Sequence, residues 1–353
     1  TVPSGDAKDI IFEDLFPLPI HQVETIDLTF GNDITLSPLD NAGLTPQSIY
    51  IHEPTNKLFI DWGDVSSATS ATPKVISVDI DVAVDSEPFA TGLTHSNFAR
   101  FYSSNSALES AASVANTAIV VAAPELHIYK GISSTNNPEA VLSPIANPVI
   151  ADAQKVDAFD WLYYDITIEN EGGSIAYDVI VNDFTPSSYL ENCQVNTVET
   201  ANGSPVPSSG NLFTTGMVID EISAAGAGDN SDEIVISTQC QVKETVEVLS
   251  EFINTAQTTW ASTAGNPARF DPVSTNSEVK IASPKAEKTA IDISPGYAQN
   301  GKVHIGEVVT YEIDLTIPEG ITRNLEISDV LPVGMAIEDI LAIEIDGGIT
   351  LST

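Results

Sequence analysis

The stretch from Val308 to Gly334 reads VVTYEIDLTIPEGITRNLEISDVLPVG, and it decides how the rest of the chain is interpreted. Apolar residues occupy every second position of its first half, with threonine and acidic residues between them. This period of two predicts a strand with one buried face, which carries Val309, Tyr311, Ile313, Leu315 and Ile317.

The second half of the stretch predicts a partner strand. Leu325 and Ile327 point to one face and Asp329 follows on that face. Pro332 ends the pairing because it has no N–H to donate. Two strands alone are not stable in water, so we expect this pair to belong to a larger sheet.

The start of the chain repeats its end. Residues 8–37 align without gaps with residues 323–352, so that Asp14 corresponds to Asp329 and Pro17 to Pro332. Both segments also finish on Ile-Thr-Leu-Ser. Two unrelated strands rarely keep so many matches in one register, which indicates an internal repeat.

A middle copy, WLYYDITIENEGGSIAYDVIVNDFTPS, begins at Trp161 and carries Asp183 at the corresponding corner. The corners at Asp14, Asp183 and Asp329 therefore predict three tandem domains. We place them at 1–123, a partial or divergent repeat, at 124–283, a complete repeat, and at 284–353, the N-terminal part of a further repeat.

The remaining runs are short and alternating, separated by turns rich in Gly, Pro, Asn and Ser, and few stretches favour a helix. This spacing predicts an all-β fold of tandem antiparallel Ig-like (Greek-key) β-sandwich domains. An Asn-Thr-Ala strand closes each of the first two domains, at Asn116 and at Asn254. Residues 97–115, dense in Ala and Ser, predict a loop with a helical turn.

The composition excludes two classes of partner. The chain has 50 acidic and 13 basic side chains and a formal charge of −37, which repels nucleic acid and anionic membrane surfaces.

No apolar run approaches the roughly 20 residues of a bilayer span, so we expect no membrane insertion in this segment. No charged and apolar leader begins the sequence, and we expect any secretion signal to lie outside it or to have been removed.

The order of VTYEIDLTI, NLEISDVLPVG, LFIDWGDV, ISVDIDVAV and Asn-Thr-Ala resembles a repeat of bacterial and archaeal surface proteins, called domain of unknown function eleven. It is also similar to the isopeptide-forming fimbrial and adhesin domains. The resemblance implies a sandwich of seven to nine strands, repeated along a secreted or wall-attached stalk, fibre or adhesin.

No catalytic motif accompanies this pattern. The five histidines are scattered without metal-ligand spacing, and neither a Gly-x-Ser-x-Gly elbow nor a phosphate-binding Gly-Lys-Ser/Thr loop is present. We therefore expect a protein that is not an enzyme.

Two interpretations remain open for the corner aspartates. We favour the one in which each carboxylate accepts backbone N–H groups in its turn. The alternative is an isopeptide trio in the middle domain, in which Lys130 attacks the carboxamide of Asn254 while Asp183 shuttles protons. That reaction needs a neutral lysine and a protonated acid, states that an apolar interior favours.

The two cysteines, Cys193 and Cys240, are too few for a thiolate metal site and do not form a Cys-x-x-Cys motif. Outside a cell, two cysteines within one sandwich favour a disulfide, and the alternative is a pair of buried thiols.

Calcium is the one candidate cofactor. The loop from Gly228 to Glu233 offers oxygen ligands on Asp229, Asn230, Asp232 and Glu233, but it lacks the Asp-x-Asp-x-Asp-Gly order of a dedicated site. A solvated acidic loop is the favoured interpretation.

The sequence thus predicts a non-catalytic structural or adhesive segment of a large secreted or cell-surface repeat protein, located outside the cell. The alternative is a calcium- or glycan-binding adhesin module, which a calcium-dependent melting temperature discriminates. The expected partners are other repeats or copies of the same surface protein, joined by strand complementation if Val309–Ile317 is lent to another first domain.

Overall fold

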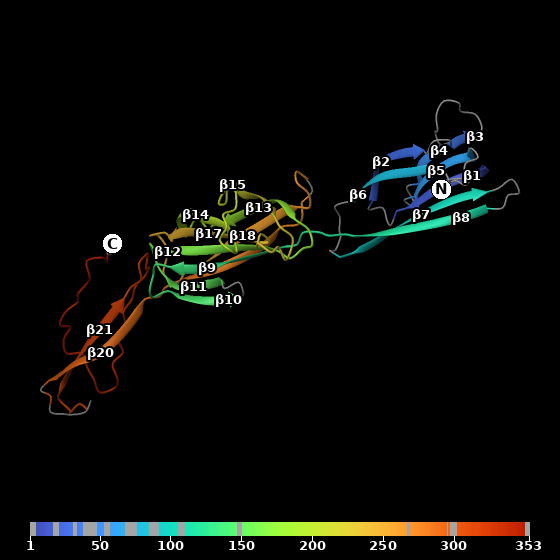
Figure 1. Ribbon diagram of the computed structural model, residues 1–353. Coiled ribbons are helices and arrows are strands. Elements are labelled where there is room, and N and C mark those ends of the chain that lie inside the picture. Colours follow the sequence, from blue (N-terminus) through green and yellow to red (C-terminus); the bar gives the residue numbers. More distant parts are fainter. Residues whose placement is uncertain are drawn as a thin grey trace.

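The computed structural model describes residues 5–16, 21–30, 34–37, 48–52, 57–67, 76–84, 92–104, 110–146, 150–266, 269–294, 296 and 302–349. All regular structure in these ranges is β-strand, which confirms the predicted all-β class. Figure 1 shows three groups of strands in a row, which we call the N-terminal unit (β1–β8), the middle unit (β9–β19) and the C-terminal unit (β20 and β21). Across these ranges there is no helix of the length and hydrophobicity that a bilayer span requires.

Two sheets form the middle unit and enclose its core. Their strands alternate buried and partly exposed residues, most regularly in β17, because each sheet has one face on the core and one on solvent. One sheet has seven strands, in the order β10 (Val141–Ala146), β11 (Ile150–Val156), β19 (Val273–Ile281), β18 (Glu251–Ala261), β13 (Ala176–Phe184), β16 (Gly216–Ile222) and β15 (Ser208–Asn211). The other has four, in the order β14 (Leu190–Thr200), β17 (Glu233–Val242), β12 (Trp161–Asn170) and β9 (Leu126–Thr135).

With eleven strands, the middle unit is larger than the seven to nine that the resemblance implies. Strands β10 and β11 extend the larger sheet beyond β19, and β11 pairs with β19 in parallel. Every other strand pair of the described residues is antiparallel.

The N-terminal unit has one larger sheet and one pair of strands. In the larger sheet β1 lies between β5 and β7, and β3, β4 and β8 complete it. The separate pair is β2 and β6. The bounds are Gly5–Leu15 (β1), His21–Phe30 (β2), Ile34–Ser37 (β3), Ser48–His52 (β4), Lys57–Ser67 (β5), Ile76–Val84 (β6), Thr94–Ser104 (β7) and Ser110–Val120 (β8).

The loop predicted for residues 97–115 is wrong over most of its length. The chain forms β7 and β8 there, which pair from Thr94 with Val120 to Ser104 with Ser110. The described side chains of β8 are all exposed. Backbone hydrogen bonds to β7 hold this strand without a buried face, and that is why its apolar pattern is weak.

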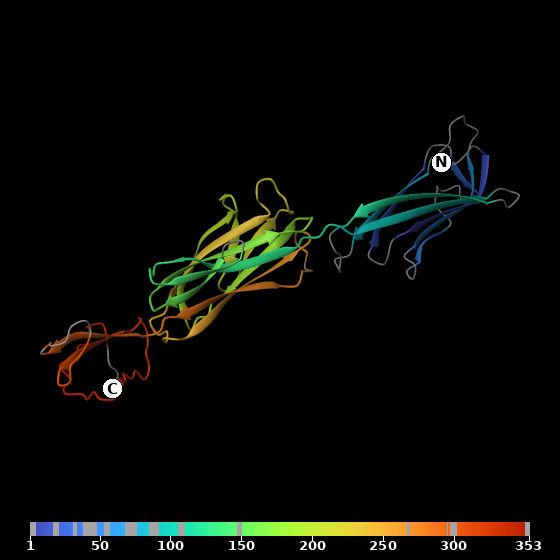
Figure 2. The same cartoon turned by 90° about the horizontal axis from the view of Figure 1, so that it is seen from below.

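The C-terminal unit is the hairpin of β20 (Lys285–Ser294) and β21 (Val308–Thr316), seen in Figure 2 at the far end from the N-terminal unit. The second strand predicted around Leu325 and Ile327 is not formed, and both side chains are exposed. A strand requires a neighbour for its backbone groups, and the hairpin does not provide one here.

The segment after β21 returns to the middle unit and contacts the connection between β17 and β18. The N–H of Ile321 donates to the carbonyl of Val246 (2.8 Å), and the guanidinium of Arg323 pairs with the carboxylate of Glu247 (2.7 Å). Gly320 has a φ of +115°, and a Cβ there would lie 2.6 Å from the carbonyl oxygen of Val246, so glycine permits this close approach.

Candidate functional site

A lysine and an aspartate meet inside the middle unit. The Nζ of Lys130 lies 2.5 Å from Oδ1 of Asp183, and neither side chain is exposed to solvent. Lys130 belongs to β9 of the smaller sheet and Asp183 to β13 of the larger one, so the ion pair spans the sandwich. A fully buried lysine is rare, and its desolvation is costly even when it is paired.

Asn254 lies on the inner face of the larger sheet beside Asp183. β13 and β18 pair in a register that sets Asp183 opposite Ala256, and Asn254 precedes Ala256 by two residues on the same face. Asn254 is 0% exposed, and neither its Oδ1 nor its Nδ2 has a hydrogen-bond partner. An unpartnered buried amide is destabilising by about 1–3 kcal/mol, so this group calls for a chemical explanation.

These three groups form a polar layer between two apolar clusters. On β9, Ile128 belongs to one cluster and Ile132 to the other, with Lys130 between them. On β18, Asn254 is likewise flanked by Ala256 of the first cluster and Phe252 of the second. Water is therefore excluded from both sides of the layer.

Burial changes the acid–base properties of the pair. It lowers the pKa of Lys130 from 10.5 to about 8, although the Asp183 carboxylate opposes this shift. It also raises the pKa of Asp183, against the opposing effect of Lys130. Both shifts move the pair toward an uncharged amine and an uncharged acid, the states that an amine nucleophile and a proton shuttle require.

Tyr164 of β12 completes the layer. The Lys130 Nζ lies 5.1 Å from the centroid of its ring. Burial and the charge of Asp183 raise the pKa of the Tyr164 hydroxyl, and Asn254 lowers it. Asn254 thus lies beside this hydroxyl, although no hydrogen bond of good geometry joins them.

The structure thus brings Lys130, Asp183 and Asn254 together. The Asp183 carboxylate accepts no backbone N–H, and its Oδ2 has no partner at all, so the favoured turn role is wrong for this corner. Since Lys130 is an amine, Asn254 a carboxamide and Asp183 an acid, the layer contains the reactants of an amide exchange.

The N-terminal unit repeats the acid and the carboxamide. Asp14 is opposite Ala99 in the pairing of β1 with β7, as Asp183 is opposite Ala256, so Asn97 corresponds to Asn254. Burial raises the pKa of Asp14, while a hydrogen bond from the Asn97 side chain lowers it. The assignment of Asn116 to this position is therefore wrong, and the exposed Asn116 lies on the next strand, β8.

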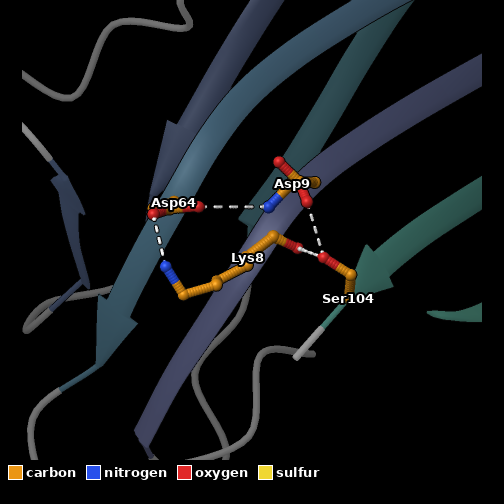
Figure 3. A network of polar contacts seen from close by, with 4 residues as sticks. All are labelled: Lys8, Asp9, Asp64 and Ser104. Atoms are coloured by element: carbon orange, nitrogen blue, oxygen red, sulfur yellow. Dashed lines mark hydrogen bonds and ion pairs between the residues drawn. The ribbon is translucent and has the colours of Figure 1, made fainter. Parts of the chain in front are cut away.

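Lys8, near the start of β1, is not part of a counterpart of the middle-unit site. Figure 3 shows Lys8, whose Nζ lies 3.0 Å from Oδ2 of Asp64, next to Asp9 and Ser104. Asp9, at a φ of 49°, accepts a 2.6 Å hydrogen bond from the Ser104 hydroxyl at a bulge of β1. This partly exposed network links β1 to β5 and β7 and does not include Asp14.

The C-terminal unit repeats the amine and the acid, a feature that the sequence interpretation missed. The Nζ of Lys288 lies 2.6 and 2.7 Å from the two carboxylate oxygens of Asp329, and 4.3 Å from the ring centroid of Tyr311. Lys288 is opposite Ile313 as Lys130 is opposite Ile166. The signal was available in part, because each lysine precedes a tyrosine of the repeated pattern in the sequence.

The two predicted disulfide partners lie on neighbouring strands. Cys193 of β14 and Cys240 of β17 are joined by a disulfide, with a sequence separation of 47. Cys240 is fully buried in the same apolar cluster as Tyr164. The bond therefore links an edge strand to the core of the smaller sheet.

We predict that reducing this disulfide lowers the free energy of unfolding by about 2–4 kcal/mol, because the unfolded chain regains the freedom of the closed loop. Urea unfolding with and without reductant measures the change. Thiol titration of the unfolded, unreduced protein is the control. No reactive thiol is the expected result, and two reactive thiols would exclude the bond.

Two carboxylates of the predicted calcium loop accept hydrogen bonds from nearby residues of the chain. Asp229 accepts hydrogen bonds from the hydroxyl and N–H of Ser231, which lower the pKa of Asp229. Asp232 accepts the N–H of Gly226 at 2.7 Å. Within the described part of the chain, no three His, Cys, Asp or Glu side chains gather as metal ligands, so Asn230 and Glu233 have no acidic cluster to complete.

No known family model matches the chain, and no curated protein sequence is significantly similar to it. Solved structures with some likeness include the major pilin subunit BcpA of Bacillus cereus. It is 14% identical, the match covers 71% of this chain and 75% of that chain, and the TM-score is 0.29. The C-terminal fragment of the major pilin GBS80 of Streptococcus agalactiae is 8% identical, with 78% of this chain and 79% of that chain covered and a TM-score of 0.25. The collagen adhesin of S. aureus is 10% identical, with 87% of this chain and 84% of that chain covered and a TM-score of 0.24. Likeness at this level carries no argument about function, which rests on the geometry above.

Proposed function

We propose that this chain is a structural segment of a secreted or cell-surface fibre or adhesin, and that an amide bond between Lys130 and Asn254 cross-links its middle unit. The observation that carries the proposal is the buried layer in which Lys130 contacts Asp183 while the carboxamide of Asn254 has no hydrogen-bond partner. A cross-link uses all three groups and removes both a buried charge and an unsatisfied amide.

The reaction consumes no other reagent. The neutral amine of Lys130 attacks Cγ of Asn254, and the protonated Asp183 hydrogen-bonds to the carboxamide oxygen as negative charge develops there. The Nζ–Cγ bond forms and the Cγ–Nδ2 bond breaks. Asp183 transfers the proton lost by the amine to the departing nitrogen, so ammonia leaves and the acid is regenerated.

The position of the bond suits a protein that bears tension. It joins β9, the first strand of the middle unit, to β18, the next to last. A force that enters at β9 passes through the bond to β18 and bypasses the strands between them. The middle unit then resists extension without unfolding, which is the property a stalk requires.

Two further observations support an extracellular role. The disulfide between Cys193 and Cys240 belongs to an oxidising compartment. The formal charge of −37 keeps a long repeat protein soluble and repels nucleic acid. Partners of this segment are, on the same proposal, other repeats or copies of the surface protein.

Peptide mapping tests the proposal directly. Trypsin does not cleave after a lysine whose Nζ is acylated, so we expect residues 101–155 to remain uncut at Lys130 and to be joined to residues 244–269, which contain Asn254. Mass spectrometry should find this branched product and no free 101–130 peptide. Recovery of unlinked 101–130, 131–155 and 244–269 would contradict the proposal.

A further inference from the structure

The side chain of Tyr164 reaches across the core of the middle unit to the carboxamide of Asn254. The tyrosine belongs to β12 of the smaller sheet and the asparagine to β18 of the larger one, and both side chains are 0% exposed. Burial and the charge of Asp183 raise the pKa of the Tyr164 hydroxyl, whereas the Asn254 side chain lowers it. The hydroxyl therefore lies beside both the carboxamide and the acid of the proposed cross-link.

The fold itself has no use for this hydroxyl. Among the described residues, the oxygen of Tyr164 has no hydrogen-bond partner, although it is buried. A buried hydroxyl without a partner costs about 1–3 kcal/mol, so a phenylalanine of the same shape would be more favourable for folding. The ring alone accounts for the contact with Lys130, whose Nζ lies 5.1 Å from the ring centroid.

A tyrosine also accompanies the amine and the acid of the C-terminal unit. Tyr311 has the place of Tyr164 in the repeated pattern, and the Nζ of Lys288 lies 4.3 Å from its ring centroid while it pairs with Asp329. Tyr311 is 38% exposed, whereas Tyr164 is 0% exposed. Because the tyrosine recurs with the lysine and the aspartate in two such different environments, core packing alone does not explain it.

The cross-linking reaction needs a hydrogen-bond donor beside the carboxamide oxygen. When the Nζ of Lys130 attacks Cγ of Asn254, negative charge develops on Oδ1. The carboxyl group of Asp183 has one proton, and it has to serve the amine and the departing nitrogen in turn. It therefore does not hold the oxygen throughout the reaction. A donor that keeps its proton stabilises the developing oxyanion at every stage.

We propose that the Tyr164 hydroxyl is this donor and that it hydrogen-bonds to Oδ1 of Asn254 while the tetrahedral intermediate exists. The inference rests on the cross-link proposed above and adds a catalytic residue to it. The Nζ–Cγ bond forms, the Cγ–Nδ2 bond breaks and ammonia leaves as before, while Tyr164 keeps its proton and is unchanged. An oxyanion donor is aimed at the oxygen of the intermediate, which agrees with a hydroxyl that lies beside the unreacted amide without bonding to it.

The rate of cross-linking in Tyr164→Phe tests the proposal, because this variant loses the hydroxyl and keeps the ring. The full chain is synthesised in a cell-free mixture, translation is stopped, and samples are denatured at intervals. Mass spectrometry gives the fraction that is about 17 Da lighter after loss of ammonia. Loss of one oxyanion donor slows a reaction about 100- to 1,000-fold, so we expect the half-time of Tyr164→Phe to be at least about 100 times that of the wild-type chain.

Tyr163→Phe is the matched control. Tyr163 is the preceding residue of β12, and its side chain lies on the opposite, partly exposed face of the strand. This variant also loses one tyrosine hydroxyl, and its cross-linking half-time should equal that of the wild-type chain. Equal slowing in Tyr163→Phe and Tyr164→Phe would overturn the inference, since it would show a general sensitivity of β12.

A second comparison separates catalysis from folding. In Asn254→Ala no cross-link forms, so melting temperatures in this background report the contribution of the hydroxyl to folding alone. The double variant Asn254→Ala/Tyr164→Phe should melt at the same temperature as Asn254→Ala or higher, because it loses an unpartnered buried hydroxyl. A lower melting temperature, or loss of cooperative unfolding, would assign the hydroxyl to packing and overturn the inference.

Failure of this inference is distinguishable from failure of the cross-link. A wild-type chain that loses ammonia, together with a Tyr164→Phe chain that loses it equally fast, would overturn the role of Tyr164 and leave the cross-link intact. A wild-type chain that keeps its full mass at all times would overturn the cross-link and the role of Tyr164 with it.

Discussion

Replacing Asn254 by alanine is expected to lower the free energy of unfolding of the middle unit by about 4–5 kcal/mol, because it removes a covalent bond that closes a loop of more than 100 residues. For a unit of this size the melting temperature falls by about 10–20 °C. Differential scanning calorimetry measures the shift. The Lys130–Asp183 pair remains in this variant, so the loss reports the bond alone.

Whether Asn254→Ala lowers or raises the stability of the middle unit distinguishes a cross-linked site from one without a cross-link. Without a cross-link, Asn254 is a buried amide with no hydrogen-bond partner, and its removal is close to neutral or stabilising. A melting temperature that stays the same or rises in Asn254→Ala therefore contradicts the cross-link. Lys8→Met is a matched control, since it removes a lysine from a partly exposed pair and should change stability by no more than about 1 kcal/mol.

Replacing Asp183 by asparagine is expected to abolish the bond and to destabilise the middle unit by more than the about 4–5 kcal/mol expected for Asn254→Ala, because Lys130 is in addition left buried without its partner. The variant should show free 101–130 peptide after trypsin digestion. Asp64→Asn, which removes the exposed partner of Lys8, is the control and should leave both the digest and the melting temperature nearly unchanged.

The same variant has a predictable pH dependence. Burial already lowers the pKa of Lys130 to about 8, and loss of the Asp183 charge, which opposes this shift, lowers it further. The unfolded chain then binds more protons than the folded one between that lowered pKa and 10.5, so stability rises with pH over this window. Melting temperatures of Asp183→Asn that fall between pH 8 and pH 10 would contradict a buried, unlinked lysine.

The strands that were predictable are those with one buried face. Tyr164, Ile166 and Ile168 alternate with polar residues because β12 lies on the core, and all three are fully buried. β8 was not predictable, because its described side chains are exposed and only its backbone pairing with β7 holds it. Periodicity reports burial, and a strand without a buried face carries no such signal.

The sequence predicted which residues form the candidate site, but it did not decide between the turn role and the cross-linking role of Asp183. Spacing placed Lys130, Asp183 and Asn254 on three strands of one unit, but burial and the missing partners of Asn254 depend on how the two sheets pack. Asn97 was missed because the Asn-Thr-Ala sequence at Asn116 is identical to the one at Asn254. The sheet register instead sets Ala99 opposite Asp14, and Asn97 lies two residues before Ala99 on the same face. Register is a property of paired strands, which a single sequence does not display.

The intact mass of the reduced, denatured monomer tests the central claim most directly. Formation of the Lys130–Asn254 amide releases one ammonia, so the account predicts a mass about 17 Da below that of the sequence. The Asn254→Ala and Asp183→Asn variants should each have the full mass of their sequences. A reduced wild-type monomer with the full mass of its sequence would contradict the account.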